Sequence, residues 1–573
     1  MYRRSPVYVL ITACVLISAS TARADWTRFR GPNGSGISAE GASTPVRWGP
    51  SANVKWKAEL PGAGVSCPIV VGDRVYVTCY SGYGLDRANP GDQKNLKRHL
   101  VCLDRRTGKQ MWSKSVDAVL PEDPYTGVGV PAHGYASSTP VSDGEQVYVF
   151  FGKTGALAFD KDGKQLWQTN VGKESDPRRW GSASSPILYK NLLIVPATAE
   201  REALIGLDTK TGKEIWRQEA AGFSQSWSTP ILVEVDKNRT DLVIGVASEI
   251  WGINPQTGKL RWYCKTSKSN EFCSSLVAHG GVVYAVGGRG GGGSIAVRVG
   301  GKGDVTSSHV LWTGRDSSRF STPIFYKDRL YSFANDVVTI IDAKTGERLA
   351  RSRLEGGSGG SSERRMGGDY GSPVLADGKV YFVGQSGDMF VLKADDKLEQ
   401  LAVNRLTAAE DEEFSATPAV SGGELFIRSN KRLYCVAAMG QTPKAVESGA
   451  VAKDPSAESG AEASGEGGRG ANGEGGRRGR RGGGDREGRG RGGRGGMFER
   501  FDANKDGKLS GDEIPERMRG MMEQLDTDKD GAVSQEEFRN GSGRMFGGRG
   551  RGGRGGNPRE GRPERPQRPP LED

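Results

Sequence analysis

The chain has 573 residues and a formal net charge of +11, with 35% hydrophobic residues and 86 glycines. This length exceeds that of one small domain, and the crowding of glycine into the last quarter excludes a uniformly globular chain. We therefore expect one large folded body at about residues 25–440, followed by segments that build no core of their own.

The first 24 residues have the pattern of an export signal. A basic start, MYRR, precedes the apolar run VYVLITACVLISAS, and Ala22-Arg23-Ala24 forms an A-x-A cleavage site before Asp25. The apolar run is short for a membrane span, and no later stretch is apolar enough to be one. We expect residues 1–24 to be a signal peptide and the mature chain to be exported, to the periplasm or the cell surface, without a transmembrane span.

Six cysteines remain after this cleavage. Most of them lie inside apolar, strand-like runs such as VYVTC, LVCLD and LYCVA. This placement favours buried free thiols over a disulfide framework, although six cysteines permit many pairings. The six are Cys67, Cys79, Cys102, Cys264, Cys273 and Cys435.

Two phrases alternate along residues 25–440. The first is a turn that ends in tryptophan, with a glycine four residues earlier, as in LDRRTGKQMW, FDKDGKQLW, LDTKTGKEIW and INPQTGKLRW. The second is a serine- or threonine-rich step, usually ending in proline, before an apolar run: SCPIV, SSTPV, SSPIL, WSTPI, CSSLV, FSTPI, GSPVL and SATPA. Proline is tolerated at the start of a strand, so each step begins one. Each unit predicts four short strands, and four strands every 50 residues or so are typical of a β-propeller.

The two ends of this folded body complement each other. The last unit has only three predicted strands, in SATPAV, GELFIRS and KRLYCVA, whereas NVKWKAEL near the N-terminus has a tryptophan strand without a unit of its own. We predict an all-β fold, an eight-bladed propeller of four-stranded blades over residues 25–440. The strand of Trp56 closes the ring, because joining the ends leaves no unpaired strand edge.

These repeats resemble the pyrroloquinoline-quinone (PQQ)-type propeller repeats of exported bacterial proteins. That group includes quinoprotein alcohol dehydrogenases and an outer-membrane assembly lipoprotein, and the lead-in DWTRFRGPNGSGIS is similar to that of exported propellers. The resemblance implies a fold without choosing an activity. A quinone dehydrogenase needs a calcium ion and an acidic base, and in that family also a vicinal disulfide. No two cysteines are adjacent here, so we do not expect this chain to bind PQQ, and we predict no catalytic residue.

An aromatic residue stands just before nearly every serine-rich step. Since the first strand of each blade should line the central axis, these residues are predicted to ring one mouth of the channel and to bind a planar ligand or a peptide. The alternative is that they only pack between neighbouring blades. They are Tyr135, Trp180, Trp227, Phe272, Phe320, Tyr370 and Phe414.

Two stretches near the C-terminus, DANKDGKLSGDE and DTDKDGAVSQEE, have the pattern of calcium loops. Oxygen ligands at positions 1, 3 and 5, a glycine at 6, a backbone carbonyl at 7 and a bidentate glutamate at 12 suit Ca²⁺. Residues 497–541 thus resemble an EF-hand pair, a small α-helical segment in which IPERMRGMMEQL serves both loops, and Leu509 and Val533 should form a short β contact. The predicted ligands are Asp502, Asn504, Asp506, Lys508 and Glu513 in the first loop, and Asp526, Asp528, Asp530, Ala532 and Glu537 in the second.

Tracts rich in arginine and glycine lie on both sides of this segment. They cannot build a core, so the linker at 441–496 and the tail at 542–573 are predicted to be disordered. Inside a cell such tracts would indicate RNA binding. For an exported chain we expect anionic lipid or polysaccharide instead, or a plain mobile linker, and no nucleic acid.

Taken in order, these elements predict an exported β-propeller scaffold with a calcium-binding segment. Its expected partners are a protein or an anionic polymer of the cell envelope, and its expected cofactor is Ca²⁺. Two rival functions remain open: a quinone-dependent dehydrogenase, and binding or hydrolysis of a cell-surface polymer.

Overall fold

The structure is a computed structural model that describes most of the predicted folded body. The described residues are 25–438 except 39–40, 128, 267–270, 288–292, 358–369 and 409–411, together with 504, 506–510, 513, 525–526, 528–537 and 566–573. The predicted signal peptide and the linker at 441–496 lie outside these residues, as does most of the shared segment IPERMRGMMEQL. The chain divides into two compact units, 1–451 with 564–573, and 452–563.

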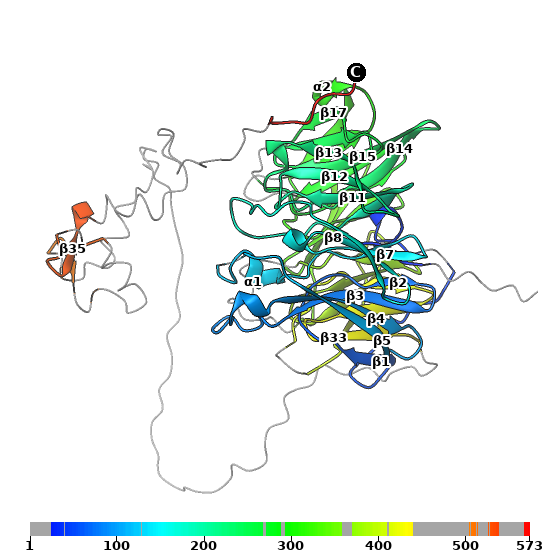
Figure 1. The fold of residues 1–573 in the computed structure, drawn as a ribbon, viewed down its shortest axis with the longest axis horizontal. Coiled ribbons are helices and arrows are strands. Elements are labelled where there is room, and N and C mark those ends of the chain that lie inside the picture. Colours follow the sequence, from blue (N-terminus) through cyan, green and yellow to red (C-terminus); the bar gives the residue numbers. More distant parts are fainter. Residues whose placement is uncertain are drawn as a thin grey trace, which may run out of the picture. The chain divides into compact units, whose positions relative to one another are not determined.

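Eight sheets, antiparallel except for one added strand in blade 4, form the propeller and are here called blades 1 to 8 (Figure 1). Their strands are β2 (Ile69–Val71), β3 (Arg74–Ser81), β4 (Lys97–Asp104) and β5 (Gln110–Asp117) in blade 1; β6 (Val141–Ser142), β7 (Gln146–Phe150), β8 (Ala156–Asp160) and β9 (Gln165–Thr169) in blade 2; β10 (Ile187–Tyr189), β11 (Leu192–Ala197), β12 (Ala203–Asp208) and β13 (Glu214–Glu219) in blade 3; β14 (Ile231–Asp236), β15 (Arg239–Val246), β16 (Glu249–Ile253), β17 (Leu260–Lys265) and the parallel β21 (Gly303–Asp304) in blade 4; β18 (Val277–His279), β19 (Val282–Gly287), β20 (Gly293–Arg298) and β22 (Val310–Gly314) in blade 5; β23 (Ile324–Tyr326), β24 (Arg329–Ala334), β25 (Val337–Asp342) and β26 (Arg348–Arg353) in blade 6; β27 (Val374–Ala376), β28 (Lys379–Val383), β29 (Met389–Lys393) and β30 (Gln400–Asn404) in blade 7; and β31 (Ala419–Ser421), β32 (Glu424–Arg428), β33 (Arg432–Val436) and β1 (Val54–Glu59) in blade 8.

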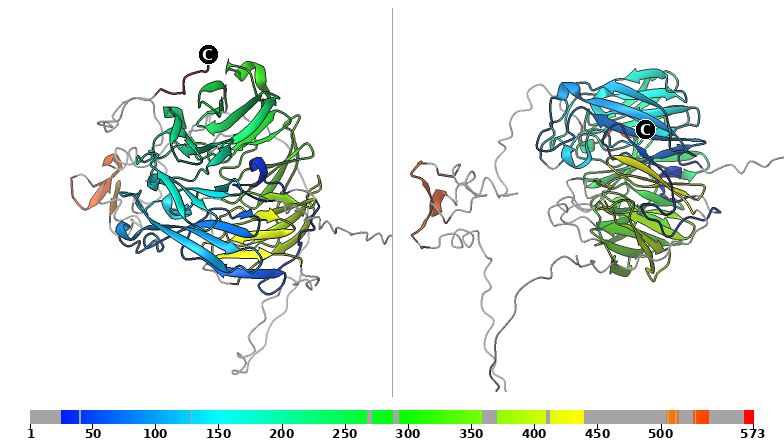
Figure 2. Two further views of the ribbon diagram at one scale, coloured as in Figure 1. Left: turned by 45° about the vertical axis from the view of Figure 1, so that its right-hand side comes forward. Right: turned by 90° about the horizontal axis from the view of Figure 1, so that it is seen from below.

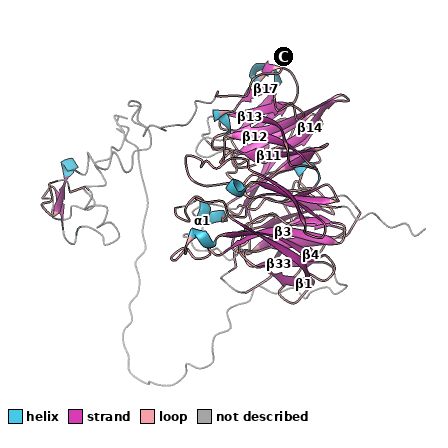
Figure 3. Ribbon diagram, viewed as in Figure 1, coloured by secondary structure: helices cyan, strands magenta, loops and turns pink. Residues whose placement is uncertain are grey.

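Helices are few and short among the described residues (Figure 3). None of those helices has the length and apolar character that crossing a bilayer requires. In the propeller unit they are α1 (Val130–His133) and α2 (Thr306–His309), with the 3-10 turns η1 (Pro32–Gly34), η2 (Gln93–Asn95), η3 (Gly152–Thr154) and η4 (Ala221–Phe223). Residues 535–537, which follow β35, are also helical.

The prediction of a ring closed by the N-terminal strand is confirmed. Strand β1 pairs antiparallel with β33, so that Trp56 lies opposite Cys435 and Lys57 opposite Tyr434. The two strands lie side by side in Figure 1, where the bar marks them blue and yellow, and in both views of Figure 2. The first strands of blades 1 and 8, β2 and β31, are also in contact. The prediction of four strands per blade holds except in blade 4, where β21 adds a fifth.

The apolar cores lie between successive blades. Ile187 and Ile194 of blade 3, for example, share one buried cluster with Leu242 and Ile244 of blade 4. Successive side chains of a strand point to opposite faces of its sheet, so one set packs on the preceding blade and the other on the following blade. Both faces of the inner strands are therefore apolar.

The serine-rich step explains how the first strands are joined around the axis. The backbone N–H of the residue two positions before the strand donates to the hydroxyl of the equivalent residue one blade further on. Seven such bonds of 2.9–3.0 Å link Cys67 to Thr139, Thr139 to Ser185, Ser185 to Thr229, Thr229 to Ser275, Ser275 to Thr322, Thr322 to Ser372 and Ser372 to Thr417. We call these eight residues the belt. Burial raises the pKa of the Cys67 thiol, while hydrogen bonds from Thr139 and Thr417 oppose that rise, so both belt neighbours of Cys67 contact it.

Replacing Thr229 by valine tests the belt. The shape is kept, but the buried N–H of Ser185, 3.0 Å from the Thr229 hydroxyl, loses its acceptor. An unsatisfied buried donor costs about 1–3 kcal/mol, and we expect the free energy of unfolding to fall by that amount. Urea unfolding followed by tryptophan fluorescence measures it, with exposed Ser51→Ala as the control. Equal stability of T229V and wild type would contradict this role.

Most tryptophans of the outer strands pack on the turn glycine of the next blade, whereas Trp262 packs on Gly252 of its own blade. A Cβ added to Gly212 would lie 2.6 Å from the ring of Trp167, and one added to Gly346 would lie 2.5 Å from that of Trp312. These glycines also have positive φ values of 69° and 77°. Glycine is therefore required twice, for the turn and for the close approach of the ring.

The lead-in at residues 25–38 packs along the first strands of several blades. Trp26 pairs with Val70 of β2 and Ile37 with Leu375 of β27, while the guanidinium of Arg28 donates to the carbonyl of Pro230. These contacts involve residues that follow the belt positions, whereas the predicted mouth aromatics precede them. The lead-in thus belongs to the end of the channel opposite the aromatic residues.

The structure departs from the predicted disordered tail at the very end of the chain. Residues 566–573 belong to the propeller unit and pair with blade 4, where Leu571 forms a parallel bridge with Leu260. The rest of the predicted tail lies outside the described residues.

Candidate metal centre and propeller mouth

The two predicted calcium loops are joined by a short two-stranded sheet. Strand β34 (Lys508–Ser510) pairs antiparallel with β35 (Ala532–Ser534), with Leu509 opposite Val533. Both of these side chains are buried. The predicted β contact is therefore confirmed, and it places the seventh position of each loop, Lys508 and Ala532, within a strand.

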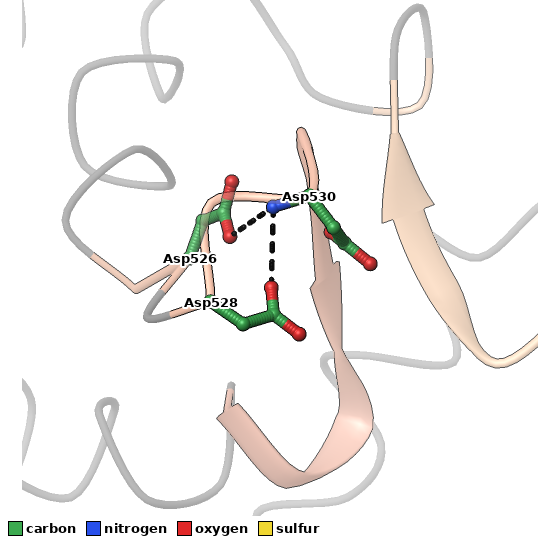
Figure 4. A group of neighbouring side chains, drawn as sticks. All are labelled: Asp526, Asp528 and Asp530. Atoms are coloured by element: carbon green, nitrogen blue, oxygen red, sulfur yellow. Dashed lines mark hydrogen bonds between the residues drawn. The ribbon is translucent and has the colours of Figure 1, made fainter.

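Three carboxylates of the second loop converge (Figure 4). Oxygen atoms of Asp526, Asp528 and Asp530 all lie within 4.8 Å of one another, and no other group of three or more potential metal ligands occurs among the described residues. The N–H of Asp530 donates to Asp526 Oδ1 and to Asp528 Oδ1, both at 3.2 Å. Gly531 has a φ of 85° and donates its N–H to Asp526 Oδ2 at 2.9 Å. The backbone thus wraps around the carboxylates, as a calcium loop requires.

The glutamate at position 12 reaches back across each loop. Glu537 Oε2 accepts hydrogen bonds from the N–H and the hydroxyl of Ser534 at 2.9 and 2.8 Å. In the first loop, Glu513 Oε1 accepts from the N–H of Asn504 at 3.1 Å and Oε2 from the N–H of Ser510 at 3.3 Å. Both glutamate carboxylates thus accept hydrogen bonds from backbone N–H groups of their own loop.

The first loop is described in part. Asn504 Oδ1 accepts a hydrogen bond from the N–H of Asp506 at 2.8 Å, and Asp506 Oδ1 accepts one from the N–H of Lys508 at 2.8 Å. Asp502, the predicted first ligand, lies outside the described residues. Carboxylate, amide and carbonyl oxygens are the donors that Ca²⁺ prefers, so the described residues fit that ion.

A lysine of the first loop contacts a predicted ligand of the second. Lys508 Nζ lies 2.7 Å from Asp530 Oδ2. This hydrogen bond raises the pKa of Lys508 and lowers that of Asp530. Both groups are exposed, so the pair contributes little to stability.

Four of the seven predicted mouth aromatics form two neighbouring pairs, and the other three contact other residues. Trp180 packs on Trp227 with ring centroids 4.8 Å apart, and Phe320 packs on Tyr370 at 4.5 Å. Tyr135 instead contacts Tyr80 at 5.4 Å within a cluster of tyrosines. Phe414 contacts Tyr434 at 6.3 Å, and Phe272 is buried against Gly245. Ligand binding by these seven residues stays a prediction.

Arginine side chains join the aromatic pairs across blades. The guanidinium of Arg319, which precedes blade 6, lies 5.4 Å from the ring centroid of Trp180, which precedes blade 3, and 4.7 Å from that of Phe320. Glu271 is 2% exposed and pairs with Arg319 at 2.8 Å and with Arg178 at 2.7 Å. A planar ligand stacked on Trp180 would compete with these contacts, although this side chain is partly exposed. The described residues do not define a quinone site, and we derive no step through a bound quinone.

A group of buried charges near the mouth was not found from the sequence. Arg98 pairs with Glu122, and its guanidinium also donates to the carbonyl of Tyr135. Lys153 Nζ lies 3.7 Å from Asp123 and donates to the hydroxyl of Ser175 at 2.9 Å. The only sequence signal is a charged residue inside an otherwise apolar strand, such as Arg98 in KRHLVCLD.

Glu200 is the most perturbed acid of this region. Burial raises the pKa of Glu200 to about 7, although a hydrogen bond from the Ser182 hydroxyl opposes the rise. Its Oε2 has no hydrogen-bond partner among the described residues. The charge of Glu122 raises the pKa of Glu200 further, and that of Arg98 lowers it. A buried carboxyl that titrates near neutral pH has the properties of a general acid or base.

The raised pKa of Glu200 predicts a pH-dependent stability. The folded chain holds the proton more tightly than the unfolded chain, so this contribution is present below pH 4.5 and is lost as pH rises through about 7. Glu200→Gln should therefore stabilise the protein at pH 8 relative to wild type, by up to about 3 kcal/mol, and leave it little changed at pH 4.5. Thermal unfolding at both pH values measures this, with exposed Glu145→Gln as the control. An equal effect of E200Q at the two pH values would contradict the prediction.

A basic hollow of about 240 Å³ lies on blade 6. Arg348 Nε there donates to Asp316 Oδ1 at 2.9 Å, and the arginines outnumber the single acid, so the hollow attracts anions. It is lined by Arg315, Asp316, Ser317, Ser332, Ala334, Val337, Thr339, Arg348 and Arg351.

Comparison with known families matches both parts of the chain. The family model described as outer membrane protein assembly factor BamB matches residues 93–233 and 225–443, which is more than half of the chain. The model described as EF hand matches residues 496–514 and 518–542.

Individual relatives are more distant. A polyvinylalcohol dehydrogenase of Pseudomonas sp. is 24% identical over 268 residues, which cover 39% of this chain and 37% of that protein. The chain thus spans little more than a third of the length of this curated relative. Among solved structures, BamB from Moraxella catarrhalis has a TM-score of 0.46 at 12% identity, covering 67% of this chain and 99% of that one. A europium-containing methanol dehydrogenase has a TM-score of 0.48 at 10% identity, with 72% and 98% covered. The chain belongs to the PQQ-like propeller-repeat family described as outer membrane protein assembly factor BamB, and it carries an EF-hand pair near its C-terminus.

Proposed function

We propose that the chain is an exported propeller scaffold that binds Ca²⁺ through its C-terminal loop pair and holds a protein or an anionic polymer of the cell envelope. The observation that carries the proposal is the matched pair of oxygen-rich loops joined through β34 and β35. Calcium outside cells is often near millimolar, the range in which extracellular modules bind it. The sites would then be filled most of the time, and the ion acts by holding the segment folded.

Calcium titration of the full chain tests the metal site. Glu513→Gln together with Glu537→Gln removes one oxyanion charge from each loop, and we expect the calcium affinity to fall at least about tenfold. Isothermal calorimetry measures it. Glu536→Gln is the matched control, because Glu536 is exposed and stands next to the predicted ligand Glu537 without being one. Unchanged affinity in the double variant would reject these two ligands.

The basic character of the chain supports the partner class. The formal charge of +11 and the arginine-lined hollow on blade 6 both favour an anionic surface. Envelope material captured on the immobilised full chain identifies the partner, and elution by salt separates an anionic polymer from an apolar protein contact. If nothing is retained from native envelope at low salt, the scaffold role is wrong.

A quinone-dependent oxidoreductase is the second candidate. It is favoured by the similarity to a polyvinylalcohol dehydrogenase and by the buried carboxyl of Glu200 beside the mouth. The test adds PQQ and Ca²⁺ to the purified chain and follows dye reduction with alcohols, including polyvinyl alcohol. A quinone absorbance band with turnover that Glu200→Gln abolishes would establish the enzyme. Neither signal is expected if the chain is a scaffold.

A further inference from the structure

The last eight residues of the chain add to the outer edge of blade 4. The N–H of Leu260, at the start of β17, donates to the carbonyl of Pro570 at 3.0 Å, and the N–H of Glu572 donates back to the carbonyl of Leu260 at 2.7 Å. Leu571 forms the parallel bridge between these two bonds. Strand β17 is the outermost long strand of its blade, and its second half is covered by β21. The tail therefore pairs with the part of this edge that β21 leaves free, which is strand addition.

The start of the tail is held by a second backbone contact. In η4, the N–H groups of Ala221 and Gly222 donate to the carbonyls of Pro566 and Gln567 at 2.8 and 2.9 Å. A Cβ on Gly222 would lie 2.6 Å from that Gln567 carbonyl and 2.4 Å from the ring of Trp251. Glycine at position 222 is thus what lets the tail approach the blade so closely.

A charged side chain of the tail pairs with the opposite charge on blade 4. Arg568 forms a bidentate pair with Glu249, and its guanidinium lies 3.8 Å from the ring centroid of Tyr263. The carboxylate of Glu249 is held in place by the indole N–H of Trp251 at 2.7 Å. Such charge-assisted, stacked pairs are the strong and geometrically selective kind.

The tail carries the opposite charge four residues further on, at Glu572. Glu572 accepts hydrogen bonds from Arg261 Nε at 2.5 Å and from the Asn254 side chain. Arg568 of the tail therefore pairs with Glu249 of β16, and Glu572 pairs with Arg261 of β17. These two pairs of opposite charge fix the register of the tail on the blade.

Proline suits this tail at the positions where it occurs. Pro566 and Pro570 contribute carbonyls, and no N–H is required at either place. Prolines also hold the free peptide in an extended conformation, so less entropy is lost when it binds.

We propose that blade 4 carries a peptide-binding site, formed by η4, Glu249, Arg261 and Tyr263, whose occupant is this chain's own C-terminus. The ligand class is an extended peptide with arginine, two prolines, an aliphatic residue and an acid in that order. The segment between 438 and 566, which includes the calcium loops, is then attached to the propeller at both ends. That tether raises the local concentration of the tail and favours binding within one chain.

Hydrogen exchange on the full chain tests the site. A chain that ends at residue 565 should exchange the amides of Ala221, Gly222 and Leu260 at least about tenfold faster than wild type, because their acceptors are removed. Arg568→Glu should do the same, and a synthetic peptide of residues 564–573 should restore protection to the shortened chain. Arg562→Glu changes the charge equally outside the described contact and is the control. Since these changes lie in the tail, the propeller should keep its thermal stability.

Two results would overturn the proposal. One is unchanged exchange of these three amides in the shortened chain. The other is protection that falls on dilution while light scattering shows a dimer dissociating, because the occupant would then be the tail of a second copy.

Discussion

Arg30→Ala is expected to lower the free energy of unfolding by about 3–5 kcal/mol, a large effect for one residue. Arg30 is fully buried, and its guanidinium donates to Thr322 at 2.9 Å and to Pro323 at 2.7 Å. It also donates to the carbonyls of Gly34, Ser35 and Pro373. Its removal leaves buried acceptors of the lead-in and of blades 6 and 7 without a donor. Chemical unfolding followed by tryptophan fluorescence measures the loss.

The control for Arg30 is an arginine of the same region with little burial. Arg47 is exposed, and its side chain donates to the carbonyl of Leu401 at 3.3 Å. Arg47→Ala should change stability by less than about 0.5 kcal/mol. Arg30→Lys should be intermediate, since an ammonium keeps the charge but lacks the planar fork. Burial lowers the pKa of Arg30 to about 9, so the group stays charged at neutral pH. Equal effects of R30A and R47A would contradict the account of the lead-in.

Trp56→Ala is expected to cost about 3–5 kcal/mol and to loosen the joint of the ring. The indole of Trp56 packs on Phe426 with centroids 6.0 Å apart and donates to the carbonyl of Arg105 at 2.8 Å. The guanidinium of Arg105 in turn donates to Glu424 of β32 at 2.8 Å. The indole thus helps to join the chain's first strand to blade 1 and blade 8. Unfolding measurements give the cost, and proteolysis near residues 54–59 reports whether β1 has separated.

Trp112 is the matched control for Trp56. It makes the same contact between blades 1 and 2, donating to Lys161 at 2.9 Å, but it is only partly buried. Trp112→Ala should cost less and should leave β1 protected from protease. If both variants expose β1 equally, Trp56 has no special role in closure.

The propeller could be predicted from the sequence because the patterns that specify its strands are local and recur along the chain. A turn glycine four residues before a tryptophan and a serine-rich step before an apolar run each describe one strand and its neighbour. The last unit lacks a fourth strand, and the strand of Trp56 belongs to no unit of its own. Pairing the two therefore completes the eighth blade and closes the ring. The EF-hand loops are local for the same reason, since the predicted ligands and the glycine lie within twelve residues.

The arrangement of the mouth could not be predicted in this way. Trp180 and Arg319 belong to blades 3 and 6, and no repeat specifies that they meet. The pairing of Arg98 with Glu122 and the burial of Glu200 depend likewise on how loops of different length pack. The repeat pattern predicted which aromatics precede the blades, but not that Arg319 would contact both Trp180 and Phe320.

The chain's sequence by itself determined the blades, their closure and the two EF-hand loops, because each rests on contacts between neighbouring strands or within one turn. Only the tertiary structure decided that Arg30 serves carbonyls of distant blades, that Glu200 titrates near neutral pH, and that residues 566–573 add to β17. The physical reason is that these features depend on desolvation and on partners hundreds of residues away, which no local pattern encodes.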